Sequence, residues 1–143
     1  LSCMMGERFS LLKEEARARQ IGHAIGMSFQ ILDDILDYEI DAHQFGKPVL
    51  EDVAQGVYTL PLIMAFPKKE KELRSLLEKK ESIYDGERKK VQQLVLKSGG
   101  VESAKVLAKK YTDRALQQIE RLPEKNVKSM LYDITSCLLQ REY

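Results

Sequence analysis

The sequence predicts an all-α fold, because helical patterns of apolar residues recur along the chain and alternating strand patterns are almost absent. Gly and Pro residues separate the helical stretches. The chain has 143 residues, of which 43% are hydrophobic, and this is enough for one folded domain with a sizeable core. Its net charge of +1 gives no overall attraction to nucleic acid, so we expect no nucleic-acid partner.

The first half of the chain is dominated by one long expected helix. Residues 1–12 form a short apolar segment, and residues 13–40 follow as a continuous helical pattern. Residues 41–50 contain a Gly and a Pro, which predict a loop. Residues 51–66 are predicted to resume as a single helix, opened by acidic residues and kinked before Pro61.

The second half is predicted to contain shorter helices. Residues 68–81 are highly charged with a thin apolar stripe, which indicates a solvent-exposed helix. A turn is expected at 82–87, and a helix over 87–97 should end at the following Ser-Gly-Gly. Apolar residues then recur with helical spacing over 101–119, and Pro123 is predicted to start the last helix.

Cysteine usage and hydropathy suggest where the protein works. Cys3 and Cys137 lie at opposite ends with no CxxC pair, which is typical of free thiols in a reducing compartment and predicts a cytoplasmic location. No apolar run is long enough to span a bilayer, and no signal peptide is visible. The opening LSCMMG lacks an initiating Met and begins as if within a helix, so we expect the chain to be part of a longer one.

Three aspartates lie within the otherwise apolar stretch FQILDDILDY, residues 29–38. On a helix Asp33 and Asp37 point the same way, and Asp34 lies about 100° round from Asp33. Two carboxylates roughly 6 Å apart repel each other by about 3 kcal/mol at an effective dielectric near 20, so a cation is expected to neutralise them. Carboxylate ligands without His or Cys favour Mg²⁺, which completes its shell with waters and substrate phosphates.

The same helix face continues toward the N-terminus through Gln30, Gly26 and Gly22. Each Gly costs about 1 kcal/mol relative to Ala in a helix, and this cost makes sense if another group approaches the backbone closely. The alternative interpretation of the aspartates is an ordinary solvated face, which their spacing alone does not exclude.

A second cluster follows in the predicted loop. FGKP, residues 45–48, comes almost directly after the carboxylate helix, and Asp52 lies a few residues further on. Lys47 could therefore lie beside a metal-bound phosphate and stabilise it. Taken alone, a lysine in a loop is more simply a surface charge.

Together these segments closely resemble the second aspartate-rich region of the trans-isoprenyl diphosphate synthases, the polyprenyl synthetase family. The family pattern is FQ-x-x-DD-x-x-D, then GKP-x-x-x-D, then G-x-x-TLP, and FQILDDILDY followed by FGKPVLEDVAQGVYTLPLIMA supplies all of it in order. The resemblance covers the whole chain. It implies that residues 1–143 are the C-terminal portion of an all-α synthase domain built around a central cavity.

The resemblance implies a Mg²⁺-dependent trans-polyprenyl diphosphate synthase, which condenses an allylic diphosphate with isopentenyl diphosphate. No residue of this part of the family pattern is assigned as a catalytic acid or base. By position, the resemblance assigns Mg²⁺ to Asp33, Asp34 and Asp37, the allylic diphosphate to Lys47, and the reacting prenyl groups to Phe29 and Gln30. Val57 stands where many members of the family have a lysine.

The resemblance also suggests partners. QGVYTLP, residues 55–61, looks most like the catalytic subunits of long-chain hexaprenyl or heptaprenyl synthases of Gram-positive bacteria. This implies a homodimer or a heterodimer with another synthase subunit, a role in menaquinone biosynthesis, and at most peripheral membrane contact for product release. The alternative is a non-catalytic subunit or helical interaction module of a heteromeric prenyl synthase. Retention of the three aspartates and Lys47 favours the enzyme, and the GKP and TLP segments argue against a terpene cyclase.

The first aspartate-rich motif of the family and its upstream basic residues do not occur in residues 1–143. We therefore predict that this chain alone does not catalyse prenyl transfer. The purified chain, incubated with an allylic diphosphate, isopentenyl diphosphate and Mg²⁺, is expected to yield no elongated product on chromatography. Measurable chain elongation would refute this prediction.

Overall fold

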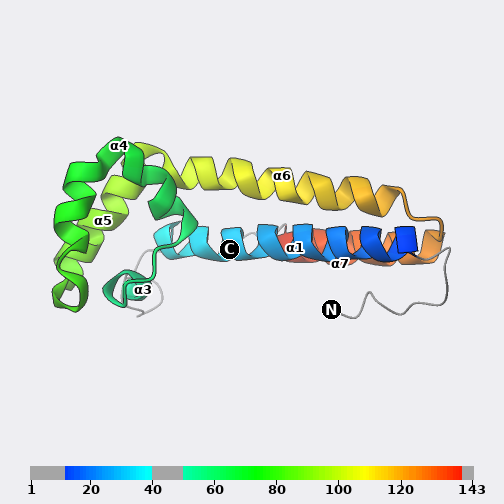
Figure 1. Ribbon diagram of the computed structural model, residues 1–143, viewed down its shortest axis with the longest axis horizontal. Coiled ribbons are helices and arrows are strands. Elements are labelled where there is room, and N and C mark those ends of the chain that lie inside the picture. The colour runs from blue at the N-terminus through cyan, green and yellow to red at the C-terminus, as the bar shows by residue number, and fades with distance from the viewer. Residues whose placement is uncertain (1–11, 40–49, 140–143) are drawn as a thin grey trace. The chain divides into compact units, whose positions relative to one another are not determined.

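The computed structural model describes residues 12–39 and 50–139, and within these ranges the chain is helical with no strand. The all-α prediction is therefore confirmed. The predicted loop at 41–50 lies outside the described residues except for its last residue, as does nearly all of the 1–12 segment. The elements, shown in Figure 1, are α1 (Leu12–Glu39), α3 (Glu51–Ala54), α4 (Leu60–Leu77), the 3-10 turn η2 (Lys80–Ser82), α5 (Asp85–Ser98), α6 (Gly100–Glu120) and α7 (Lys125–Leu139).

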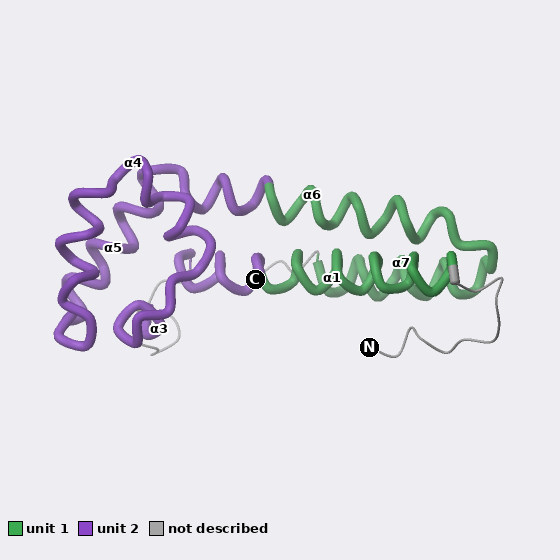
Figure 2. The backbone as a smooth tube through the Cα atoms, in the orientation of Figure 1, with its two compact units in different colours: residues 1–30, 107–143 green, residues 31–106 purple. Residues whose placement is uncertain are grey.

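The chain divides into two compact units, shown in Figure 2, and α1 and α6 each contribute to both. Unit 1 comprises residues 1–30 and 107–143, and unit 2 comprises residues 31–106. None of the helices in the described ranges is both long enough and apolar enough to cross a bilayer.

Unit 1 has a core formed by small and branched side chains. Ile21 and Ala24 of α1 are buried there, as are Ala115 and Ile119 of α6. The Ser28 hydroxyl is fully buried, and it lies 2.8 Å from the Thr112 hydroxyl and 3.1 Å from the Ala108 carbonyl oxygen, to which it donates. These contacts tie α1 to α6 within this unit and satisfy a polar group that would otherwise be costly to bury.

The last helix, α7, belongs to unit 1 and differs from a simple core helix. It begins at Lys125, slightly later than the predicted start at Pro123. The helical recurrence of its apolar residues is as expected, but Val127, Met130 and Ile134 are exposed in the described structure. α7 therefore presents an apolar stripe on its surface.

Unit 2 is built on α4 packed against α5. The single helix predicted over 51–66 is wrong, because α3 ends at Ala54 and α4 begins at Leu60. Gly56 adopts φ +79° between them, a left-handed conformation that interrupts a helix and that glycine adopts at little steric cost. Pro61 lies in the first turn of α4, where its missing N–H is not needed, so it helps to start the helix instead of kinking it.

The solvent-exposed helix predicted over 68–81 is the second half of α4, which ends four residues earlier than expected. α4 continues through Pro67 with one distorted residue, Lys69 at φ −133° and ψ 29°, and ends at Leu77. The charged side chains are mostly exposed, but Leu73 on the thin apolar stripe is fully buried. The stripe is thus sufficient to hold the second half of α4 in the core of unit 2.

The two glycines after Ser98 have different roles. Gly99 ends α5 in the left-handed conformation, at φ +78°, so the predicted stop of this helix is confirmed. Gly100 begins α6 where a Cβ atom would lie 2.4 Å from the Pro61 carbonyl oxygen and 2.9 Å from the Ala65 Cβ. Only glycine lets the first turns of α4 and α6 approach this closely.

Substituting Gly100→Ala is expected to destabilise the chain by about 1–3 kcal/mol, because the added methyl group overlaps backbone atoms of α4. Gly22→Ala is the matched control, since a Cβ atom there meets nothing within 4 Å. It should stabilise the chain by up to about 1 kcal/mol through helix propensity. Urea unfolding measures both, and equal shifts in the same direction would contradict this account of Gly100.

Candidate functional site

Helix α1 carries the predicted acidic cluster, which we define as Asp33, Asp34 and Asp37. The opposite side of the helix is buried at intervals of three and four residues, at Ile21, Ala24, Ser28, Ile31, Ile35 and Tyr38. At 100° per residue, Asp33 lies about 200° round from Ile31. The buried stripe therefore directs Asp33 and Asp37 away from the core of unit 2.

The exposure of these side chains follows that geometry. Asp37 is exposed, whereas Asp33 and Asp34 are half-buried. Further toward the N-terminus of α1, Gln30 is exposed and Phe29 is half-buried. Each of these five residues takes part in an interaction, so none of them is free. The structure thus places five of the six predicted site residues on one helix, on its open and flanking faces.

Gly22 and Gly26 continue the same face, and their surroundings are open. A Cβ atom added at either position would meet nothing within 4 Å. Within the described part of the chain, no neighbour requires a glycine at either position. The prediction that another group approaches the α1 backbone at these glycines is therefore not explained by the described residues and stays a prediction.

Lys47, the sixth predicted site residue, lies outside the described residues, as does the rest of FGKP. The segment after it is described. Asp52 lies in the first turn of α3 with an exposed side chain, and its carbonyl oxygen accepts a hydrogen bond of 2.8 Å from the Val57 amide. Val57 itself is 51% exposed, so an uncharged side chain stands at the surface after α3.

Sequence reasoning did not identify the role of Tyr38, the last residue of FQILDDILDY. Its side chain is only 1% exposed, and its phenol oxygen accepts a hydrogen bond of 3.5 Å from the Thr59 hydroxyl at the start of α4. Its spacing of three and seven residues from Ile35 and Ile31 could have predicted its burial. Tyr38 joins the acidic stretch to the TLP segment inside unit 2.

The electrostatic environment of Tyr38 reflects the carboxylates around it. Burial raises the pKa of its phenol from 10.0 to about 12, and the negative charges of Asp37, Asp34 and Asp52 act in the same direction. The hydrogen bond from Thr59 lowers the pKa and opposes them. The charges of Asp52 and of two members of the acidic cluster thus all act on the Tyr38 phenol.

No three His, Cys, Asp or Glu side chains within residues 12–39 and 50–139 converge closely enough to hold a metal ion by themselves. A site formed only by protein ligands is therefore absent from this part of the chain. The carboxylates of the acidic cluster are the donor type that a hard divalent cation prefers. They fit an ion that takes few protein ligands and completes its shell with other oxygen atoms.

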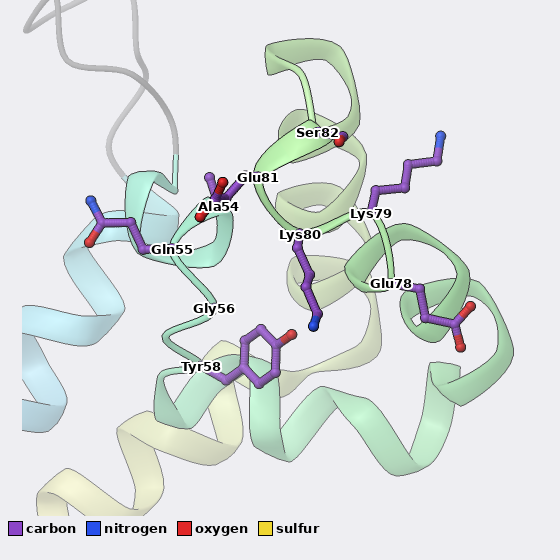
Figure 3. A pocket seen from close by; sticks show the side chains of 9 residues that line it. All are labelled: Ala54, Gln55, Gly56, Tyr58, Glu78, Lys79, Lys80, Glu81 and Ser82. Carbon is purple, nitrogen blue, oxygen red and sulfur yellow. The ribbon is translucent and has the colours of Figure 1, made fainter.

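Unit 2 also contains a pocket of about 700 Å³, between α3 and η2. Figure 3 shows Tyr58 and Lys80 pointing toward each other across this pocket, whereas the side chains of Lys79 and Glu78 point away from it. Its lining contains two lysines and two glutamates, so its charges balance. None of the five site residues that the structure describes lines it.

The sequence pattern of one protein family, described as Polyprenyl synthetase, matches residues 1–97 of this chain. The match includes the acidic cluster and the segment through the TLP motif. It extends over more than half of the chain.

Named relatives and a solved structure agree with that match. Solanesyl-diphosphate synthase 2, chloroplastic, from Oryza sativa subsp. japonica is 38% identical over 122 residues, which are 85% of this chain and 30% of the rice protein. Heptaprenyl diphosphate synthase component 2 from Geobacillus stearothermophilus is 31% identical over 99% of this chain and 45% of its own length. The crystal structure of geranylgeranyl pyrophosphate synthase from Lactobacillus brevis, complexed with citrate, is similar with a TM-score of 0.83 and 44% identity, over 90% of this chain and 41% of that chain. The chain thus spans less than half the length of each of these proteins.

The raised pKa of Tyr38 predicts a pH dependence of stability. Between pH 10 and 12 the unfolded chain loses the phenol proton and the folded chain keeps it, so stability falls as pH rises through this window. Between pH 10 and 12 the free energy of unfolding of wild type should fall by up to about 3 kcal/mol more than that of Tyr38→Phe. Urea unfolding at several pH values in metal-free buffer measures the difference. Parallel pH dependences of the two proteins would contradict the assignment.

Proposed function

Because this chain belongs to the polyprenyl synthetase family, we propose that residues 1–143 are the C-terminal portion of a prenyltransferase that joins an allylic diphosphate to isopentenyl diphosphate. The observation that carries this proposal is the acidic cluster on the open face of α1, in a segment that matches the family. The chain spans less than half of its relatives' length, so the complete reaction requires structure beyond that described above.

We propose Mg²⁺ as the metal held by the acidic cluster. Mg²⁺ binds through one or two carboxylates together with waters and substrate phosphates, which agrees with a cluster that forms no closed protein site. When bound, the ion supplies positive charge to the departing diphosphate. A cation held by Asp33 and Asp37 would reduce the repulsion between their carboxylates.

The chain's own residues have separate proposed roles around the diphosphate. Asp33, Asp34 and Asp37 hold the metal directly or through water. Lys47 contacts the allylic diphosphate as a point charge. Phe29 and Gln30 face the reacting prenyl groups, and their positions one turn before Asp33 on α1 support this role. Val57 contributes no charge to this site.

The Geobacillus relative is named component 2 of a heptaprenyl synthase, and this name supports a second subunit as partner. We propose an assembly with another synthase subunit, or a homodimer, in the cytoplasm, with a long-chain product that serves menaquinone biosynthesis. A non-catalytic subunit or interaction module is the alternative function. Retention of the full acidic cluster favours the enzyme, since an interaction module has no need of mutually repelling carboxylates.

Calorimetry with inorganic pyrophosphate tests the proposal. Wild type is expected to bind pyrophosphate only when Mg²⁺ is present, and Asp33→Ala should weaken that binding by about tenfold or more, because a metal ligand is lost. Asp133→Ala is the matched control, since Asp133 is an exposed helical aspartate of α7. It should bind as wild type does.

One result would contradict the proposed Mg²⁺ site. If pyrophosphate binding is the same with and without Mg²⁺, and the same in Asp33→Ala as in wild type, the interaction-module alternative is supported. Circular dichroism of each variant verifies that the helices are intact, so that weaker binding is not a result of unfolding.

A further inference from the structure

The C-terminal end of α1 is electrostatically unfavourable. The last carbonyl groups of a helix have no partner within it and carry the negative end of its dipole. No basic residue lies in the last turn of α1, while Asp37 and Glu39 add negative charge there. This turn directly follows Asp34 and contains Asp37, so contacts from other elements must hold the part of α1 that carries the acidic cluster.

Gln92 of α5 makes such a contact. Its side-chain amide donates a hydrogen bond of 2.8 Å to the Tyr38 carbonyl oxygen, across 54 residues of sequence. Gln92 is half-buried and follows Val91, which is fully buried in the core of unit 2. Its amide caps one of the orphan carbonyl groups of α1.

Two further elements of unit 2 hold the same turn. The Thr59 hydroxyl at the start of α4 donates to the phenol oxygen of Tyr38 at 3.5 Å, and the Lys105 ammonium of α6 pairs with the Glu39 carboxylate. The Lys105–Glu39 pair is about 40% exposed on both sides, so solvent screens it. The Thr59 contact is long. Of the three contacts, the hydrogen bond from Gln92 is the one that is neither long nor an exposed ion pair.

We propose that Gln92 is a positioning residue for the metal site, which fixes the rotation and the end of α1 and thereby aims the acidic cluster. Tyr38 follows Asp37 directly, and each helical residue is rotated 100° from the previous one. If the backbone at Tyr38 loses its hydrogen bond, the direction of the Asp37 carboxylate is therefore less well fixed. Metal ligands lose affinity when the groups that orient them are removed. This inference rests on the proposed Mg²⁺ role of the acidic cluster.

Manganese provides a spectroscopic test. Mn²⁺ replaces Mg²⁺ as the probe, inorganic pyrophosphate supplies the phosphate oxygens, and the free Mn²⁺ signal in electron paramagnetic resonance reports the dissociation constant for the full 143-residue chain. Gln92→Met keeps the side-chain length and removes the donor. It is expected to weaken Mn²⁺ binding by about fivefold, the effect of one lost hydrogen bond, and to speed amide exchange at Asp37 and Tyr38.

Gln93 provides the matched control, because it is the next residue of α5 and is exposed. Gln93→Met should bind Mn²⁺ with the wild-type constant. Gln92→Glu and Gln93→Glu form a second pair in case the first variant does not fold. In Gln92→Glu a carboxylate faces the Tyr38 carbonyl oxygen, so binding should weaken at least as much as in Gln92→Met.

A purely structural role predicts a different result. In that case Gln92→Met lowers the melting temperature while the Mn²⁺ dissociation constant stays at its wild-type value below the transition, and this outcome would overturn the inference alone. If wild type itself binds no Mn²⁺ with pyrophosphate, the proposed metal site is wrong and the inference falls with it. The wild-type measurement therefore separates the two failures.

Discussion

The burial of one face of α1 is the constraint on which the candidate site depends. Between Ile21 and Tyr38, residues at helical spacing form one buried stripe. Because this side of the helix is buried, the direction of the opposite side is fixed. Asp33 and Asp37 point away from the core because Ile31 and Ile35 point into it, and Asp34 flanks the buried stripe. The carboxylates of the acidic cluster repel one another, so the chain uses apolar burial in unit 2 to hold together charges that would otherwise separate.

Much of this could be predicted from the sequence, because helical periodicity and Gly-Pro interruptions are local signals. The helix expected over 13–40 is α1, and the Ser-Gly-Gly stop is the end of α5. The prediction over 51–66 is wrong because acidic and apolar residues continue through a segment that Gly56 interrupts. The charged helix expected over 68–81 is the second half of α4, and its few apolar residues, such as Leu73, reach a core that only the tertiary structure reveals.

Some residues of the candidate site could likewise be predicted from the sequence, and others could not. The acidic cluster lies within ten residues of sequence, so its residues could be predicted as candidates from the sequence. Gln92 could not be, since a glutamine in a charged helix carries no signal, and its contact with Tyr38 spans 54 residues. The groups that bind a ligand are often visible in a sequence, whereas the groups that orient them emerge only when distant elements pack together.

The close crossing at Gly100 links these observations. A Cβ atom at this position would lie 2.4 Å from the Pro61 carbonyl oxygen. Pro61 stands two residues after Thr59, and the Thr59 hydroxyl donates to the phenol oxygen of Tyr38. The start of α4 thus lies between Gly100 and the end of α1 in this series of residues. Natural variation at this glycine would disturb the packing of the first turns of α4 and α6 even where every residue of the acidic cluster is retained, and surveys confined to the signature aspartates would count such a variant as intact.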